Sequence, residues 1–130
     1  MANELVLIVE DNDKNMKLAR DVLNFAGFRT VEATDGETGV RLAAEHSPAL
    51  ILMDIQLPGI DGITALERIR SDEKTAAIPA IALTASVMSG DRERFVKAGF
   101  DGFIAKPIDV SAFPGQIRDV IARGRTGMTA

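Results

Sequence analysis

Short apolar runs alternate along the chain with longer segments in which apolar residues recur every three or four positions. The short runs cover residues 5–9, 28–33, 49–53, 80–83 and 102–105. In the longer segments, such as 13–26 with Met16, Ala19 and Leu23, the spacing is that of one helical face. This alternation is typical of βαβ units, which build parallel sheets. The pattern therefore predicts an α/β fold with five strands and five helices.

Polar residues and glycines mark where the predicted helices begin and end. Asp13, Asp35 and Asp61 stand at the positions where N-caps are expected. Gly27 and Gly99 stand where the helices before them are expected to end. The two helices that remain are predicted over residues 88–98 and over a final segment that reaches residue 123.

Pro114 restricts the start of the last predicted helix. A proline in a helix interior loses a hydrogen bond and costs about 3 kcal/mol, whereas in the first turn its missing N–H matters little. With Ser111 as the N-cap, Pro114 is the third helical residue. We therefore expect this helix to start late and then to pack through Ile117, Val120 and Ile121.

Right-handed crossovers leave few possible strand orders. The order 2-1-3-4-5 gives a flavodoxin-like parallel sheet with helices on both faces, and its switch point lies between the first and third strands. We expect residues 1–123 to form one domain, followed by a short tail over residues 124–130 and by no output domain.

Composition excludes several classes of protein. The chain has 130 residues, of which 46% are apolar, and this suits one compact domain. It has no cysteine, no apolar run long enough to span a bilayer, and no basic segment before its first apolar run. A net charge of −4 argues against nucleic acid as a partner. We expect a cytoplasmic protein that binds neither nucleic acid nor membranes.

Polar side chains follow or close four of the predicted strands. They are Glu10 and Asp11 after the first strand, Asp54 at the third, Thr84 at the fourth and Lys106 at the fifth. Parallel strands end at the same edge of a sheet, and ligands bind in the crevice outside those ends. The sequence therefore predicts a site for a cation and a phosphoryl group at this edge.

The three carboxylates at this edge repel one another unless a cation lies between them. Mg²⁺ is suited to this place because it prefers oxygen ligands and bridges carboxylates to phosphate. A calcium loop starting at Asp11 is a rival interpretation, but Met16 and Val22 replace its required glycine and glutamate. A helix cap is the rival role for Asp54, but the next predicted helix begins only near Asp61. An ionised aspartate can instead attack phosphorus and form an acyl phosphate.

Four segments together resemble a response-regulator receiver domain of two-component signalling, within the CheY-like superfamily. They are residues 9–12 (Val-Glu-Asp-Asn), 53–62 (Met-Asp-Ile-Gln-Leu-Pro-Gly-Ile-Asp-Gly), 83–85 (Leu-Thr-Ala) and 105–107 (Ala-Lys-Pro). The resemblance covers about residues 4–123. Residues 12–18 and 78–85 most resemble DivK-type single-domain cell-cycle regulators and the receivers of hybrid kinases.

The resemblance implies roles for the acidic residues. Asp54 would accept a phosphoryl group from the phosphohistidine of a histidine kinase or of a histidine phosphotransfer protein. Asp11, Asp54 and the backbone carbonyl of Gln56 would hold Mg²⁺ directly. Glu10 would act on the metal through water.

The resemblance also implies a switch that reads the phosphoryl group. Lys106 and Thr84 would contact the phosphoryl oxygens, and Phe103 matches an aromatic residue that turns inward as Thr84 moves toward phosphate. Ordinary packing is the alternative role for Phe103. Gln56 and Ser86 occupy positions that tune dephosphorylation. The fourth helix, fifth strand and fifth helix would form the face that regulates partner proteins such as kinases.

On this interpretation the chain is a phosphoacceptor that catalyses only its own phosphorylation and dephosphorylation, not an enzyme. Two alternatives stay open. A degenerate receiver would bind partners without being phosphorylated, but the intact set of Asp11, Asp54, Thr84 and Lys106 counts against it. An aspartate-based phosphohydrolase of the haloacid-dehalogenase type needs a second aspartate two residues after the nucleophile, where this chain has Gln56.

Overall fold

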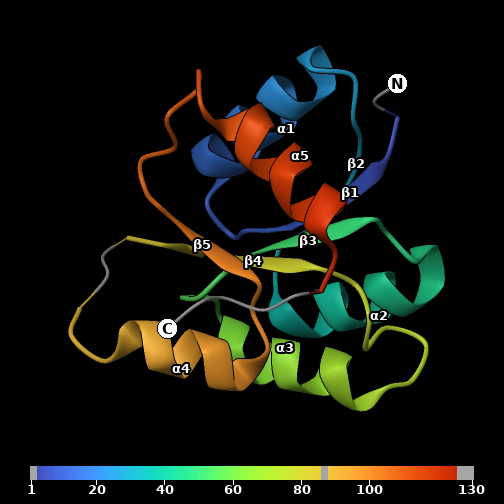
Figure 1. Cartoon of the computed structure of the whole chain (residues 1–130), viewed down its shortest axis with the longest axis vertical. Coiled ribbons are helices and arrows are strands. Elements are labelled where there is room, and N and C mark those ends of the chain that lie inside the picture. The colour runs from blue at the N-terminus through green and yellow to red at the C-terminus, as the bar shows by residue number, and fades with distance from the viewer. Residues whose placement is uncertain (1–2, 86–87, 126–130) are drawn as a thin grey trace.

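The computed structural model describes residues 3–85 and 88–125. These residues form a parallel sheet with the strand order β2-β1-β3-β4-β5, and helices cover it on both sides (Figure 1). The strands are β1 (Leu5–Val9), β2 (Arg29–Ala33), β3 (Leu50–Asp54), β4 (Ala80–Thr84) and β5 (Gly102–Ala105). The helices are α1 (Asp13–Phe25), α2 (Gly36–His46), α3 (Gly62–Ser71), α4 (Asp91–Ala98) and α5 (Phe113–Arg123). The predicted fold class and strand order are confirmed.

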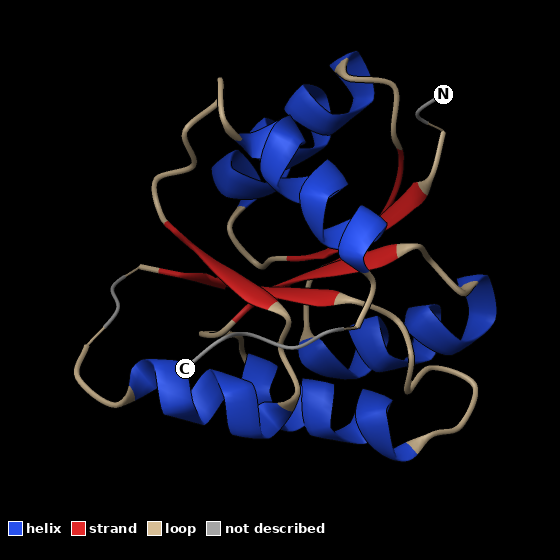
Figure 2. Ribbon diagram, viewed as in Figure 1, coloured by secondary structure: helices blue, strands red, loops and turns tan. Residues whose placement is uncertain are grey.

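Helices lie on both sides of the sheet (Figure 2), and each face of the sheet buries its own apolar cluster. α1 and α5 cover one face, over side chains that include Ile8 and Leu52. α2, α3 and α4 cover the other face, over side chains that include Leu7 and Met53. Neighbouring residues fall in different clusters because successive side chains of a strand point to opposite faces. β3 is buried at every position, which explains its continuous apolar run.

Side-chain caps fix the starts of the first three helices. Asp35 and Asp61 cap α2 and α3, as predicted, and each accepts a hydrogen bond from the backbone N–H three residues on. The N-cap of α1 is Asn12, whose side chain accepts from the Asn15 N–H, so the prediction of Asp13 was wrong by one residue. Asp13 lies instead in the first turn, where a negative charge is favourable.

α4 begins at Asp91, later than its predicted start at residue 88. Gly90 has a φ of +89°, outside the helical region, and glycine reaches such angles readily because it lacks a Cβ. The Asp91 carboxylate accepts a hydrogen bond from the Met88 N–H and so closes a turn ahead of the helix. Apolar spacing alone therefore placed the start of this helix too early.

α5 begins at Phe113, which confirms the late start expected from Pro114. Its N-cap is Ala112, so the prediction of Ser111 was wrong by one residue. The backbone N–H and hydroxyl of Ser111 both donate instead to the carboxylate of Asp109. These bonds fold the residues before the helix into a turn and delay its first turn.

A buried charged cluster lies at the amino edge of the sheet, where β4 and β5 begin. We call Arg70, Asp101 and Arg125 the amino-edge cluster. The Asp101 carboxylate is 3.2 Å from Arg70 Nη2 and 3.1 Å from Arg125 Nε, and it accepts a hydrogen bond from the Ala80 N–H. Both arginines also donate to the carbonyl of Gly99. Arg125 thus ties the start of the predicted tail to the sheet, whereas residues 126–130 of that tail lie outside the described residues.

No helix in the described part of the chain is long and apolar enough to cross a membrane.

Candidate functional site

The predicted site residues meet at the carboxyl edge of the sheet. We call Glu10, Asp11, Asp54, Thr84 and Lys106 the carboxyl-edge site. The register sets neighbouring strand ends against one another, in the pairs Val9–Met53, Asp54–Leu83 and Thr84–Ala105. The Lys106 N–H then donates to the carbonyl of Thr84 at 2.7 Å, which extends the ladder beyond β5. Four strands therefore each supply part of the site.

Lys106 bridges two buried carboxylates. Its Nζ lies 3.0 Å from Asp54 Oδ2 and 3.0 Å from Glu10 Oε1. Glu10 is 1% exposed and Asp54 is 3% exposed. The contact with Asp54 is a hydrogen bond, but the contact with Glu10 is an ion pair only, so Glu10 Oε1 accepts no hydrogen bond within the described residues. The ammonium compensates part of the cost of burying this oxygen, which still has room to accept a hydrogen bond.

The electrostatics of the site follow from two acids and one base in a small buried volume. Burial, and then the contact with Asp54, raises the pKa of Glu10 to about 7, although a hydrogen bond from the Asn12 N–H acts in the opposite direction. Burial by itself lowers the pKa of Lys106, but its ion pairs with Asp54 and Glu10 outweigh burial and raise that pKa. The ammonium therefore stays charged, and the site remains short of positive charge.

The donor set fits Mg²⁺. Glu10, Asp11 and Asp54 each offer a carboxylate oxygen, and these oxygens lie within 4.8 Å of one another. Asp11 is exposed at the mouth of the site, which leaves the metal the water ligands that Mg²⁺ usually keeps. Glu10 Oε1, which accepts no hydrogen bond from the described residues, gives a bound cation or its water an acceptor. All three donors are hard oxygens, as this ion prefers.

Two backbone features of the structure, at Gln56 and after Lys106, bear on the predicted roles of these residues. The backbone N–H of Gln56 donates to Asp54 Oδ1 at 3.0 Å, and this bond orients the carboxylate. The carbonyl of Gln56 stays a predicted metal ligand. The Lys106-Pro107 peptide bond is cis. Ser86, the other position that the resemblance connects with dephosphorylation, lies outside the described residues.

Thr84, within the carboxyl-edge site, and Phe103, beside it, lie on adjacent strands. Thr84 closes β4 and is 8% exposed. Phe103 is half-buried on β5, where its ring is tilted by 52° against the ring of Phe95, with centroids 6.0 Å apart. Its packing joins the cluster that α2, α3 and α4 cover.

Two residues around the site make contacts that sequence reasoning did not predict. Gly62 begins α3 directly against Asp54, and a Cβ at this position would overlap the carbonyl oxygen of Asp54. The Asp-Gly pair at 61–62 was a sequence signal that could have pointed to this close approach. It was used only to predict where the helix starts. Arg92 places its guanidinium over the ring of Phe103, 5.1 Å from the centroid. No sequence pattern indicated this second contact.

Comparison with known sequences points to one family. The sequence profile of the response regulator receiver domain matches residues 6–118. A relative from Brucella ovis, the polar-differentiation response regulator DivK, is 44% identical over 116 residues, which cover 89% of this chain and 94% of the relative.

Solved structures of receiver domains share the fold of this chain. The receiver domain of the sensor histidine kinase PA1611 from Pseudomonas aeruginosa PAO1, solved with a magnesium ion in its active-site cleft, is 35% identical. It superposes with a TM-score of 0.81, over 94% of this chain and 97% of that domain. The chemotaxis protein CheY4 of Vibrio cholerae superposes with a TM-score of 0.87, over 92% of this chain and 99% of that protein. At 21% identity, CheY4 supports the fold alone.

Proposed function

The chain belongs to the response regulator receiver domain family, and we propose that it accepts a phosphoryl group on Asp54 and then binds its partners differently. The donor is a phosphohistidine of a histidine kinase or of a histidine phosphotransfer protein. One observation carries the proposal. The carboxylate of Asp54, 3% exposed, lies 3.0 Å from the Lys106 ammonium, beside two further carboxylates.

In the proposed transfer an ionised oxygen of Asp54 attacks the phosphorus of the phosphohistidine. A P–O bond forms while the P–N bond breaks, and the imidazole leaves with the electron pair and takes up a proton. The Lys106 ammonium offsets negative charge on the phosphoryl oxygens, and the Thr84 hydroxyl donates a hydrogen bond to one of them. Attack by water on the acyl phosphate later returns Asp54 and inorganic phosphate. Positioning and electrostatics supply the rate in such transfers.

Asp11, Asp54 and the Gln56 carbonyl would hold Mg²⁺ directly, and Glu10 would act through water. When bound, Mg²⁺ supplies positive charge opposite the phosphoryl oxygens. Two observations support this assignment. Glu10 Oε1 accepts no hydrogen bond from the described residues, and the similar Pseudomonas receiver was solved with magnesium in its cleft.

The phosphoryl group then changes the face formed by α4, β5 and α5. We propose that Thr84 moves toward phosphorylated Asp54 and that Phe103 follows into the space beside β4. Partner proteins such as kinases bind the two forms of this face with different affinities, since a switch carries a signal only if those affinities differ. The similarity to DivK, a polar-differentiation response regulator, favours a regulatory role of this kind.

Intact mass spectrometry tests the proposal after incubation with acetyl phosphate and Mg²⁺. We expect one phosphoryl adduct per chain, and we expect none with a chelator or with Asp54→Asn. Asp61→Asn is the matched control, because it removes an acid near the site but keeps an N-cap residue for α3. That variant should form the adduct.

Two outcomes would contradict the proposal. A native chain that gains stability from Mg²⁺ but forms no adduct would be a degenerate receiver that acts by binding alone. Continuous release of phosphate from phosphate monoesters would instead show a phosphohydrolase.

A further inference from the structure

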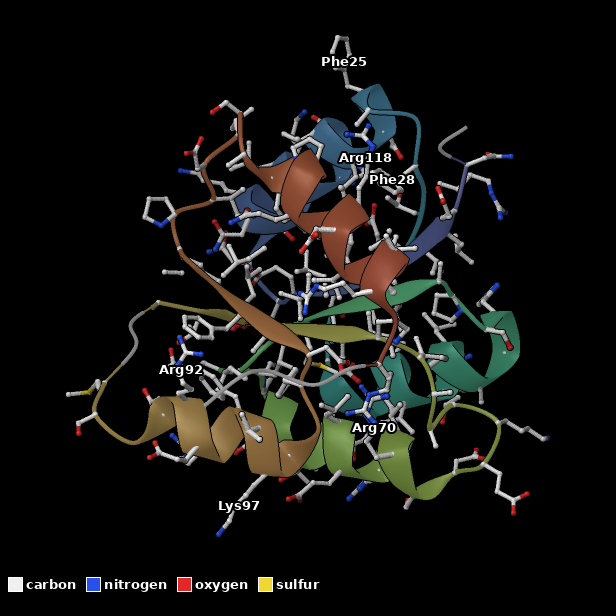
Figure 3. All side chains as sticks on the ribbon, in the orientation of Figure 1. Phe25, Phe28, Arg70, Arg92, Lys97 and Arg118 are labelled. Atoms are coloured by element: carbon white, nitrogen blue, oxygen red, sulfur yellow. The ribbon has the colours of Figure 1, made fainter. Side chains whose placement is uncertain are left out.

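Arg92 covers the ring of Phe103 from the first turn of α4. Its Cζ lies 5.1 Å from the ring centroid, and a cation over an aromatic face is attracted to it. Figure 3 shows Arg92 between the start of α4 and the sheet, whereas Lys97 on the same helix points away from the sheet. Arg92 is exposed and Phe103 is half-buried, so the contact lies at the solvent side of the switch.

Phe103 and Thr84 are diagonal neighbours on one face of the sheet. In the register Phe103 pairs with Ala82, and Thr84 pairs with Ala105. Alternate residues of a strand share a face, so all four side chains lie on the side covered by α4. The two alanines are small, which leaves the ring and the hydroxyl without a large side chain between them.

The strand order sets the direction in which these side chains can move. β4 lies between β3 and β5, so Asp54 and Phe103 are on opposite sides of Thr84. A Thr84 hydroxyl that moves toward phosphorylated Asp54 therefore moves away from Phe103 and opens volume on the β5 side. A ring that fills this volume must leave the guanidinium of Arg92.

We infer that Arg92 is a positioning residue that holds Phe103 in its resting place and so opposes the phosphorylated form. The inference rests on the proposed function, because it concerns the side chain that moves after Asp54 is phosphorylated. A contact present in only one of two conformations shifts their equilibrium by its own free energy. Exposed cation–π contacts are weak, so loss of this one should shift the equilibrium on the order of two- to five-fold.

The test measures how tightly the full chain binds beryllofluoride, a phosphoryl mimic, in the presence of Mg²⁺. Arg92→Gln removes the cation and keeps most of the side-chain length. We expect this variant to bind beryllofluoride on the order of two- to five-fold more tightly than the wild type. Arg92→Lys keeps a cation over the ring and should restore most of the wild-type affinity.

A second readout follows Phe103 itself. The chain has six Phe and neither Trp nor Tyr, so labelling with 4-fluorophenylalanine gives a simple fluorine NMR spectrum. Phe103→Leu identifies the signal of Phe103. In free Arg92→Gln, we expect that signal to move toward its position in the beryllofluoride-bound wild type. A role of Arg92 in folding alone would leave this position unchanged.

Arg118→Gln is the matched control. Arg118 lies over the ring of Phe28, 5.4 Å from its centroid, on the other face of the sheet (Figure 3). This variant removes the same kind of contact and should leave both readouts unchanged. If wild type binds beryllofluoride while Arg92→Gln matches it in affinity and in the Phe103 signal, the inference about Arg92 is wrong. If wild type binds no beryllofluoride, the proposed function fails and the inference fails with it.

Discussion

The amino-edge cluster and the carboxyl-edge site lie at opposite ends of one sheet and are both built around buried carboxylates, but they differ in charge balance. Asp101 faces two guanidiniums and accepts a backbone N–H. Glu10 and Asp54 share the single ammonium of Lys106, and Glu10 Oε1 accepts no hydrogen bond from the described residues.

The difference is the one expected between a structural cluster and the phosphoryl site proposed above. Burial, and then the charge of Arg125, lowers the pKa of Arg70 to about 10. This value is still well above neutral pH, so the guanidinium stays charged. The amino-edge charges therefore join α3, β4, β5 and the chain after α5 without needing a ligand. The carboxyl edge holds an excess of negative charge that costs stability, and such a cost is expected where a site must bind a cation.

The largest contrast should come from the same substitution at each edge. Asp101→Asn leaves two guanidiniums without their buried counter-charge and should lower the free energy of unfolding by about 3–5 kcal/mol. Asp54→Asn removes one of two carboxylates that share one ammonium, so it should leave that free energy unchanged or raise it. Urea denaturation followed by circular dichroism, in the absence of Mg²⁺, measures both. Equal losses for the two variants would show that the edges do not differ as described.

A smaller effect should distinguish the two arginines of the amino-edge cluster. The Arg70 side chain is 12% exposed and also donates to the carbonyls of Ala76, Ile78 and Gly99. Arg70→Gln leaves these acceptors unsatisfied and should cost about 2–3 kcal/mol of unfolding free energy.

Arg125→Gln is its control at a 31% exposed position and should cost less than about 1 kcal/mol. If Arg125→Gln costs as much as Arg70→Gln, then the tie to the chain after α5 matters more than burial.

The smallest effect is a pH dependence that only the carboxyl edge should produce. The pKa of Glu10 is about 7 in the folded chain, above the ordinary value of 4.5 for a glutamate. Between these values the folded state keeps a proton that the unfolded state releases, so the contribution of Glu10 to stability is fully present below pH 4.5 and is lost as pH rises to about 7. Without Mg²⁺ we expect this loss to be about 1–2 kcal/mol, because water at the exposed mouth of the site solvates ionised Glu10 in part.

Denaturation curves across this pH range check the expectation. Glu10→Gln has no such proton to release and should flatten the dependence, and saturating Mg²⁺ should flatten it in the wild type. Parallel curves for wild type and Glu10→Gln would assign the pH dependence to other groups.

Much of the fold and of the candidate site could be predicted because both follow from periodicity and strand direction. Apolar runs located the strands, and parallel strands must end at one edge, which brought Asp54 and Lys106 together across 52 residues of chain. The exact residues at which helices begin were harder to predict. Asn12 and Asp13 are both good cap residues, and only the backbone geometry at Asn12 selects between them.

The sequence by itself determined the sheet, its order and the acidic edge with its lysine, because these depend on patterns repeated along the chain. The tertiary structure alone decided that Asp101 pairs with Arg70 and Arg125, that Gly62 lies against Asp54, and that Arg92 covers Phe103. Each of these contacts joins single side chains or backbone groups from different elements. They depend on how α3, α4 and the loops pack against the sheet, and no local spacing of residues encodes that packing.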